Sequence, residues 1–174
     1  RIERIVLSDL GLDGVADDAR VRRVAGSIAD AGVLEQALAG PVDAVFHLAS
    51  VPGGAAERDP VLGRRVNLDA TLHLLELLRL QEAAPRLVFA STVAVYGDAL
   101  PEAVDEQTPP APALSYGAHK LACEILIADA ARRGDVDACS LRLPGVVARP
   151  GDGAGLISAF MSRLLWKLRA GEPI

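Results

Sequence analysis

Residues 86–92 read Arg86-Leu87-Val88-Phe89-Ala90-Ser91-Thr92, and residues 43–49 read Asp43-Ala44-Val45-Phe46-His47-Leu48-Ala49. In both stretches apolar side chains follow one another directly and do not alternate with polar ones. Strands of a parallel sheet that is covered on both faces have this pattern. The two stretches therefore predict a parallel sheet in the interior of the protein.

Strand and helix patterns alternate along the rest of the chain. Other short β-rich runs predict three further strands, at 2–9, 21–25 and 137–143. Helical patterns lie between or after the strands, at 31–39, 63–81, 115–133 and 154–170. Such alternation is typical of α/β proteins, so we expect a doubly wound parallel sheet of the Rossmann type with helices on both faces.

The chain is expected to be the middle part of a longer protein, truncated at both ends, because it runs from Arg1 directly into a strand pattern and stops at Ile174 just after a helical stretch. A doubly wound nucleotide-binding fold opens with a strand and a Gly-rich turn, and neither precedes residue 2. One strand–turn–helix unit of roughly 30 residues would be missing. Residues 10–20 are also short for the crossover of about 12 residues that joins parallel strands, so this connection is either minimal or incomplete.

Composition excludes several classes of protein. The 174 residues are 51% hydrophobic, which is enough for a sizeable core. No apolar run reaches the ~18 residues of a membrane span, and the first residues do not resemble a signal peptide. The net charge of −5 argues against nucleic acid or an anionic membrane as the main partner. Cys123 and Cys139 do not form a disulfide framework or a zinc motif, so we expect a cytoplasmic protein.

Tyr116 and Lys120 are separated by four positions in the predicted helix 115–133. On a helix this spacing places the phenol and the ammonium on one face, one turn apart. A nearby ammonium stabilises a phenolate, and the pair is then able to act as a general base on an alcohol. The alternative is an ordinary surface pair, so the rest of the chain has to decide between the two.

Polar or small residues stand at the carboxyl ends of several predicted strands. Asp9 ends the first of them, where an acid hydrogen-bonds ribose hydroxyls and favours NAD over NADP, although an exposed turn aspartate is the alternative. Leu48, Ala49 and Ser50 end or follow another strand, and small residues there let the backbone lie against a flat cofactor. The hydroxyl of Thr92 suits a hydrogen bond to a substrate oxygen.

The histidines do not predict a metal site. His47 lies within a buried strand and is expected to be a buried, hydrogen-bonded side chain. His73 and His119 have no cysteine or acidic companions at metal-ligand spacing. We therefore expect no metal.

Taken together, these residues resemble the extended short-chain dehydrogenase/reductase family, also called the NAD-dependent epimerase/dehydratase family. The resemblance runs from Asp9 to about Gly151 and rests on five blocks: Val45-Phe46-His47-Leu48-Ala49, Val66-Asn67-Leu68, Ser91-Thr92-Val93-Ala94-Val95-Tyr96-Gly97, Tyr116-Gly117-Ala118-His119-Lys120 and Leu141-Arg142-Leu143-Pro144. Within the family the chain looks most like the D-erythronate dehydrogenase branch. The cues are Asn67-Leu68-Asp69-Ala70-Thr71, Ser115-Tyr116-Gly117 and the run from Leu141 to Gly151.

The resemblance implies a role for each matching residue of the reaction site. Tyr116 would be the catalytic base, and Lys120 would be its partner and bind the nicotinamide ribose. Thr92 would orient the substrate hydroxyl. Asn67 would hold either the cofactor region or a relay water.

The resemblance also implies further cofactor contacts. Pro144 and Val146 would touch the nicotinamide carboxamide through backbone groups. After its third strand the family often has an acid that contacts adenine, whereas this chain has Gly26-Ser27-Ile28. We therefore expect Ser27 and Ile28 to form a weaker adenine contact, in part through the backbone of Ile28.

The implied function is NAD-dependent oxidation of a secondary alcohol of a sugar acid such as D-erythronate. Residues 1–151 would form the NAD-binding Rossmann-type domain, and residues 152–174 would begin the substrate-binding region. A nucleotide-sugar 4-epimerase is the alternative, whereas Val93 and Ala94 replace the acids with which a dehydratase performs elimination. A dinucleotide-sensing regulator is a third reading, but such proteins typically lose the tyrosine or the lysine.

Two expectations concern partners. Arg149 could pair with a substrate carboxylate, and an ordinary surface arginine is the alternative. The helices at 63–81 and 115–133 carry more apolar side chains than one buried stripe requires. Together with the family resemblance, they predict a homodimer with a four-helix interface, unless another domain covers the excess.

Overall fold

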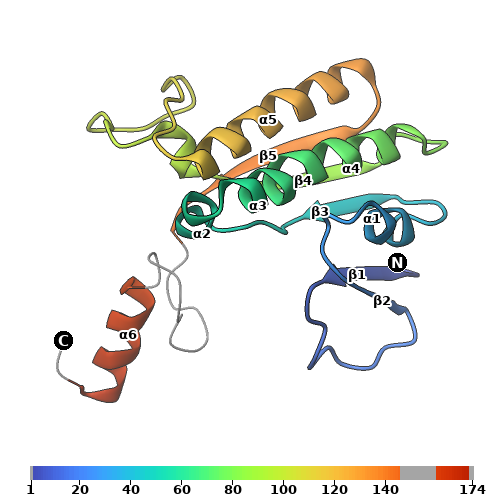
Figure 1. Ribbon diagram of the computed structural model, residues 1–174, viewed down its shortest axis with the longest axis horizontal. Helices are drawn as coiled ribbons and strands as arrows, with labels where there is room; N and C mark the ends of the chain where they lie inside the picture. The colour runs from blue at the N-terminus through green and yellow to red at the C-terminus, as the bar shows by residue number, and fades with distance from the viewer. Residues whose placement is uncertain (1, 146–159, 173–174) are drawn as a thin grey trace.

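The computed structural model describes residues 2–145 and 160–172 (Figure 1). Its strands are β1 (Ile5–Asp9), β2 (Val21–Ala25), β3 (Ala44–His47), β4 (Arg86–Thr92) and β5 (Asp137–Leu143). β1 pairs with β2, and β4 lies between β3 and β5, with every pair parallel. The prediction of a parallel α/β fold is therefore confirmed.

Helices connect most of the strands. They are α1 (Ala31–Ala37), α2 (Gly53–Arg58), α3 (Pro60–Arg64), the π-helical turn η1 (Arg65–Asp69), α4 (Ala70–Arg79), the 3-10 turn η2 (Val93–Tyr96), α5 (Ser115–Arg133) and α6 (Phe160–Ala170). Helix α5 has the predicted bounds, and the predicted helix 63–81 corresponds to α3, η1 and α4 in succession. Helix α6 covers 160–170 of the predicted 154–170, and residues 154–159 lie outside the described part of the chain.

The connection between β1 and β2 is minimal. Residues 10–20 contain no helix, and they pass directly into β2, which pairs in parallel with β1. Arg23 ties this loop down, because its Nη2 donates hydrogen bonds to the Val15 and Ala16 carbonyl oxygens at 2.6 and 3.3 Å. Residues 10–20 thus form a short connection without a helix.

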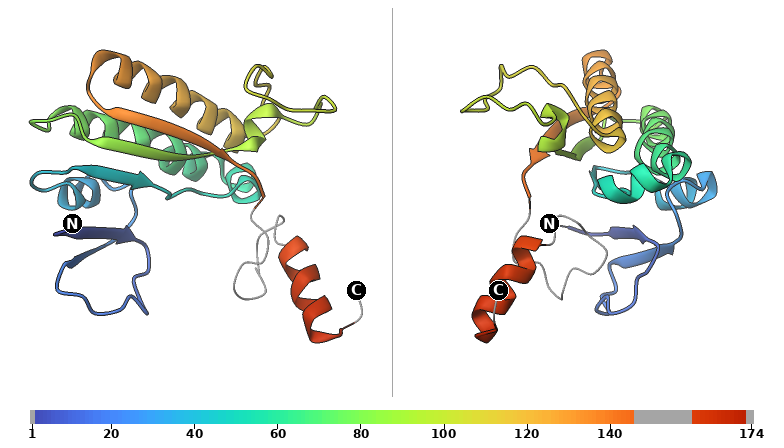
Figure 2. Two further views of the ribbon diagram at one scale, coloured as in Figure 1. Left: turned by 180° about the vertical axis from the view of Figure 1, so that it is seen from behind. Right: turned by 60° about the vertical axis from the view of Figure 1, so that its left-hand side comes forward.

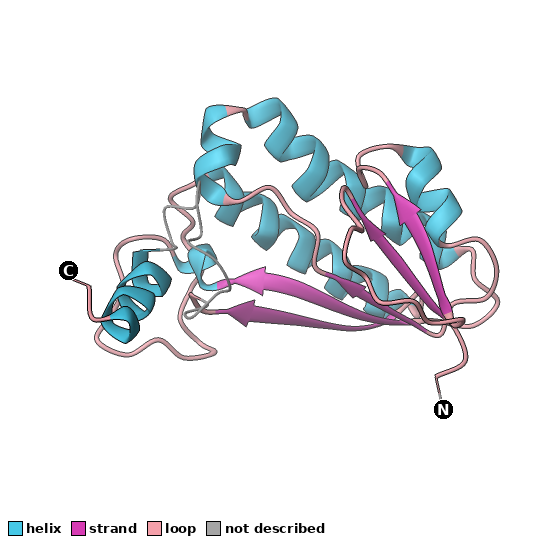
Figure 3. Cartoon of the chain, turned by 90° about the horizontal axis from the view of Figure 1, so that it is seen from below, coloured by secondary structure: helices cyan, strands magenta, loops and turns pink. Residues whose placement is uncertain are grey.

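The core lies between the β3–β4–β5 sheet and helices α1, α4 and α5 (Figures 2 and 3). Leu87 and Phe89 of β4 are fully buried against Leu78 and Ile127 of the helices. Burying a side chain of this size contributes about 1.5–3 kcal/mol. The core therefore fixes α5 over β4.

The other face of the sheet is more open. Phe46 of β3, whose neighbours Val45 and His47 turn toward the helices, is 69% exposed. Leu141 of β5 is 44% exposed. Within the described residues, α1, α4 and α5 cover one face of this sheet, whereas the expected helix layer on the other face is not seen.

Candidate functional site

Tyr116 and Lys120 lie one turn apart on α5, beside the carboxyl end of β4. Lys120 is only 1% exposed, and its Nζ donates a 2.8 Å hydrogen bond to the Ala90 carbonyl oxygen. The same Nζ lies 4.5 Å from the centre of the Phe89 ring and 5.9 Å from the centre of the Tyr116 ring. Burial lowers the pKa of Lys120 to about 8. A poorly solvated ammonium of this kind favours an anion or hydroxyl beside it.

Thr92 lies at the end of β4 and begins the turn η2. Its Oγ1 accepts a 3.1 Å hydrogen bond from the Ala94 N–H and thereby caps η2, while the hydroxyl proton remains available for donation. The first turn of α5 packs closely on η2, because a Cβ on Gly117 would lie 2.5 Å from the Ala94 carbonyl oxygen. A glycine next to Tyr116 thus brings the helix of the phenol against the turn that follows Thr92.

Asn67 holds the segment after β3 in place. It is 1% exposed and lies in η1, a π-helical turn of the kind often found at functional sites. Its Oδ1 accepts from the Val51 N–H at 2.7 Å, and its Nδ2 donates to the Val51 carbonyl oxygen at 2.9 Å. These bonds fit the expected role of holding the cofactor region, since Leu48, Ala49 and Ser50 directly precede Val51.

A buried polar cluster lies beneath this segment. Thr71 Oγ1 donates to the Asn67 carbonyl oxygen at 3.2 Å and lies 2.9 Å from His47 Nε2. Because the single proton of the threonine hydroxyl goes to Asn67, His47 donates to Thr71 from Nε2. Burial, helped by the charge of Lys120, lowers the pKa of His47 to about 4. The predicted structural role of His47 is confirmed.

Helix α2, which was not predicted, lies against the start of α5. A Cβ on Gly53 would be 3.7 Å from the Tyr116 Cβ, so the backbone of α2 passes close to that side chain. Glu57 Oε1 accepts a 2.6 Å hydrogen bond from the Ser115 N–H. Because Leu114 offers no side-chain cap, Glu57 supplies one from a remote segment.

Glu124 and Arg142 form a second contact between α5 and the sheet that sequence reasoning missed. Arg142 Nη2 lies 2.8 Å from Glu124 Oε2. The hydrogen bonds to Glu124 raise the pKa of Arg142. The one available signal was spacing, because Glu124 stands one further helical turn beyond Lys120.

Three expected cofactor residues lie at the tips of β1 and β2. Asp9 is exposed and accepts a 3.4 Å hydrogen bond from the Gly11 N–H. Ser27 Oγ accepts from the Ala29 N–H at 3.2 Å, whereas Ile28 packs its side chain against the core. β1 and β2 form a sheet separate from β3–β4–β5. In the described structure these three residues do not contact Tyr116, Lys120 or Thr92.

The remaining expected residues follow β5. Pro144 is exposed directly after the strand. Val146 and Arg149 lie outside the described residues. Their expected roles therefore stay predictions.

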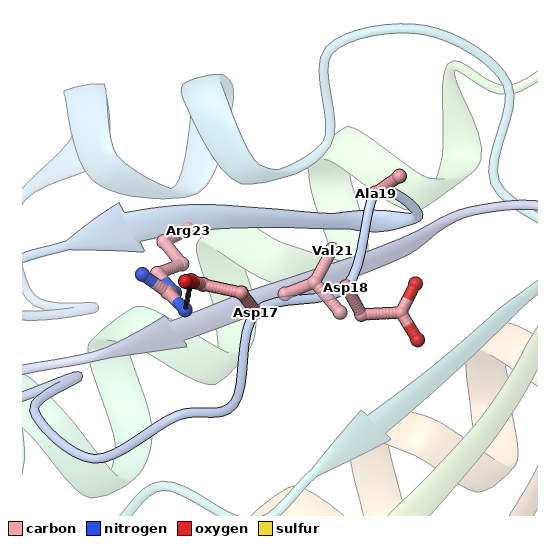
Figure 4. A pocket seen from close by; sticks show the side chains of 5 residues that line it. All are labelled: Asp17, Asp18, Ala19, Val21 and Arg23. Carbon is pink, nitrogen blue, oxygen red and sulfur yellow. Dashed lines mark hydrogen bonds and ion pairs between the residues drawn. The ribbon is translucent and has the colours of Figure 1, made fainter.

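A separate open hollow lies beside β2 and the loop that precedes it (Figure 4). It is lined by Asp17, Asp18, Ala19, Val21 and Arg23, and it includes no expected site residue. Asp17 pairs with Arg23 at 3.0 Å and Asp18 with Arg20 at 2.6 Å, so both acids are neutralised locally.

The described residues hold neither a metal centre nor a membrane-spanning helix. No group of His, Cys, Asp or Glu side chains there has the arrangement of a metal centre. Within the same residues, every helix is too short or too polar to cross a membrane.

Residues 6–174 match the model of the NAD dependent epimerase/dehydratase family. The chain belongs to this family. The D-erythronate dehydrogenase of Cupriavidus necator is 46% identical over 164 residues, which are 94% of this chain and 51% of that relative. The D-erythronate dehydrogenase of Haemophilus influenzae is 36% identical over 156 residues, or 90% and 50% of the two chains. The chain thus spans about half the length of the curated relatives it matches.

Solved structures of this epimerase/dehydratase family have the same fold. A nucleoside-diphosphate-sugar epimerase from Agrobacterium tumefaciens has a TM-score of 0.83 and 33% identity, over 94% of this chain and 49% of the other. The UDP-glucose 4-epimerase of Thermus thermophilus, solved as a complex with NAD, has a TM-score of 0.80 and 28% identity, over 97% and 56%. The family predicted from the motifs is therefore confirmed, and with it the Rossmann-type fold and NAD as the cofactor of these enzymes.

Proposed function

We propose that this chain is the NAD-binding and catalytic part of a dehydrogenase that oxidises a secondary alcohol of a sugar acid, D-erythronate or a close analogue. The observation that carries the proposal is the Tyr116–Lys120 pair held at the carboxyl end of β4 beside Thr92. The names of the two D-erythronate dehydrogenase relatives support the substrate class. Residues 1–151 would form the cofactor domain, and the substrate-binding region would begin at 152–174.

The described residues fit NAD. The carboxylate of Asp9 is exposed at the tip of β1, where it would accept from the adenosine ribose and disfavour a 2′-phosphate. The backbone at 48–50 is held by Asn67 and would lie along the cofactor. Lys120 has further N–H donors for the nicotinamide ribose besides the one directed at Ala90.

Three more residues would complete the cofactor contacts. Ser27 and the backbone of Ile28 would face adenine, and Pro144 would contact the carboxamide. When bound, NAD supplies the hydride acceptor for the oxidation. The protein then has to position the alcohol and remove its proton.

Each residue of the site would have its own role in the reaction. Thr92 Oγ1 would hold the substrate hydroxyl, and the phenolate oxygen of Tyr116 would remove its proton. The ammonium of Lys120 would stabilise that phenolate, and its buried setting strengthens the effect. Positioning both groups on α5 and β4, two elements of one core, fixes their geometry.

The direct test is NADH formation by the full-length protein with NAD and a panel of sugar acids that includes D-erythronate and the uronates, with NADP as the control cofactor. We expect turnover on an acid with NAD and little with NADP. NAD binding without turnover of any acid would contradict the proposed substrate class.

The second candidate is a nucleotide-sugar 4-epimerase. The two solved epimerases at 33% and 28% identity favour it, because the same base would serve both reactions. Val93 and Ala94, which follow Thr92, offer no acid for an elimination. An epimerase would interconvert nucleotide sugars without net NADH, so the same panel extended to nucleotide sugars separates the two.

We also infer a homodimer through α4 and α5. Leu72 of α4 is 36% exposed, and Ile125 and Leu126 of α5 are 62% and 38% exposed. Light scattering of the full-length protein tests this, and Ile125→Glu should give a monomer.

The free thiols of Cys123 and Cys139 fit the expected cytoplasmic location.

A further inference from the structure

An ion pair joins α5 to β5 next to the candidate site. The side chains of Glu124 and Arg142 are only 11% and 28% exposed. Arg142 Nη2 lies 2.8 Å from Glu124 Oε2, and Arg142 Nε lies 3.1 and 3.2 Å from the two carboxylate oxygens. This is a two-pronged contact of guanidinium and carboxylate, which fixes orientation as well as distance.

Hydrogen bonds connect this ion pair to β4 and η2. Ser91 Oγ donates a short hydrogen bond to Glu124 Oε1. Arg142 Nη1 donates to the Tyr96 hydroxyl oxygen at 2.8 Å, and its guanidinium lies 4.9 Å from the centre of the Tyr96 ring. One network of hydrogen bonds therefore joins α5, β4, β5 and η2.

The ends of this network flank the two groups that the proposed reaction uses. Ser91 directly precedes Thr92, and Tyr96 ends the turn that Thr92 begins. Glu124 follows Tyr116 by two helical turns on α5. The nitrogens of Arg142 are directed at Glu124 and Tyr96, so its charge is satisfied within the protein.

We propose that Glu124 and Arg142 are positioning residues, which hold the Thr92 turn against the helix of Tyr116 so that the two hydroxyl groups act on the same substrate oxygen. The inference rests on the proposed function, because it assigns the network a role toward Thr92 and Tyr116. It names residues that act through the site residues and do not touch the substrate themselves.

The first variant is Arg142→Lys, which keeps the charge but cannot bind Glu124 and Tyr96 at once. The second is the double variant Glu124→Gln/Arg142→Met, which leaves no unpaired buried charge, and such replacements of a pair are often tolerated by the fold. The matched control is Arg86→Lys. Arg86 of β4 pairs with Asp137 of β5 at the amino ends of these strands, and both side chains are more exposed than Glu124 and Arg142.

We expect both variants to lower kcat by at least about tenfold while the KM for the acid and the Kd for NAD change by less than about threefold, because misplacement affects the reacting geometry more than binding. Arg86→Lys should keep kcat. A kcat for Arg142→Lys within about twofold of the parent enzyme would overturn the inference.

A second readout does not depend on turnover. The amides of Gly97 and Ala111 donate to the Ala94 and Val95 carbonyl oxygens at 3.3 and 2.9 Å, so their hydrogen exchange reports on the η2 turn. We expect faster exchange at both amides in Arg142→Lys and no change in Arg86→Lys. Unchanged exchange in Arg142→Lys would overturn the inference. If no acid is oxidised by the parent enzyme, the proposed function fails while this exchange result still decides the role of the network.

Discussion

The Nζ of Lys120 donates a 2.8 Å hydrogen bond to the carbonyl oxygen of Ala90, so the ammonium on α5 is fixed to β4 two residues before Thr92. This bond ties the two elements of the candidate site together. It also holds a positive charge where only 1% of the residue reaches solvent. Burying this charge lowers the stability of the folded protein, whereas the proposed reaction needs the charge at this position.

Lys120→Met should abolish turnover without lowering stability at neutral pH. The folded pKa of Lys120 is about 8, below its ordinary 10.5, because burial disfavours the ammonium. The folded state therefore releases the proton first, and stability rises with pH between those two values by up to about 3 kcal/mol. Below pH 8 the full burial cost is present.

Urea unfolding of both proteins as a function of pH measures this effect. We expect the parent protein to gain stability above pH 8 and Lys120→Met to lose that dependence. Equal pH dependence in the two proteins would show that Lys120 is not the group responsible.

His47 should make the protein sensitive to acid. Its folded pKa of about 4 lies below the ordinary 6.5, because burial and the nearby charge of Lys120 disfavour the imidazolium. The unfolded chain therefore binds the proton first as pH falls. Stability is complete above pH 6.5 and is lost toward pH 4, by up to about 3 kcal/mol.

His47→Gln keeps a donor toward Thr71 but does not titrate. The Tm of this variant should therefore depend less on pH between about 4 and 6.5 than the Tm of the parent protein. His73→Gln is the control, since the His73 side chain is 30% exposed on α4 and outside this cluster. If His47→Gln loses as much stability at low pH as the parent protein, groups other than His47 cause the loss.

Asn67→Ala should weaken NAD binding. It leaves the N–H and carbonyl of Val51 without their side-chain partner, and the loss of such hydrogen bonds costs about 1–3 kcal/mol. Calorimetry should show a Kd for NAD raised by about tenfold or more. Thr71→Val is the control, because it removes the bond to the Asn67 carbonyl but leaves both bonds to Val51. A Kd equal to that of the parent protein would remove Asn67 from the support of the cofactor segment.

Much of the fold could be predicted from the sequence. The strands 86–92, 137–143 and 21–25 and the helix 115–133 have the predicted bounds, because short β-rich runs and helical periodicity are local signals that the sequence itself carries. The π-helical turn at Arg65–Asp69 could not be read from residue types. Asn67 within this turn bonds to Val51, which lies 16 positions earlier in the chain.

The site could be predicted only where the spacing was local. Tyr116, Lys120 and Thr92 lie within one strand–loop–helix unit, and the structure brings that unit together. Glu57 could not be found in this way, because it meets Ser115 across 58 positions of sequence. Arg142 belongs to a block that carries the family resemblance, but only the tertiary fold brings Glu124 of α5 against it.

The most direct test of the central claim is the kcat of Tyr116→Phe with NAD and the acid that the parent enzyme oxidises best. The substitution removes one oxygen and keeps the ring that packs beside Gly53, so folding and the Kd for NAD should be unchanged. Because a general base contributes about 10²–10⁴-fold to a rate, we predict that kcat falls by at least about 100-fold. Retention of more than a few per cent of the parent kcat would contradict the assignment of Tyr116 as the base.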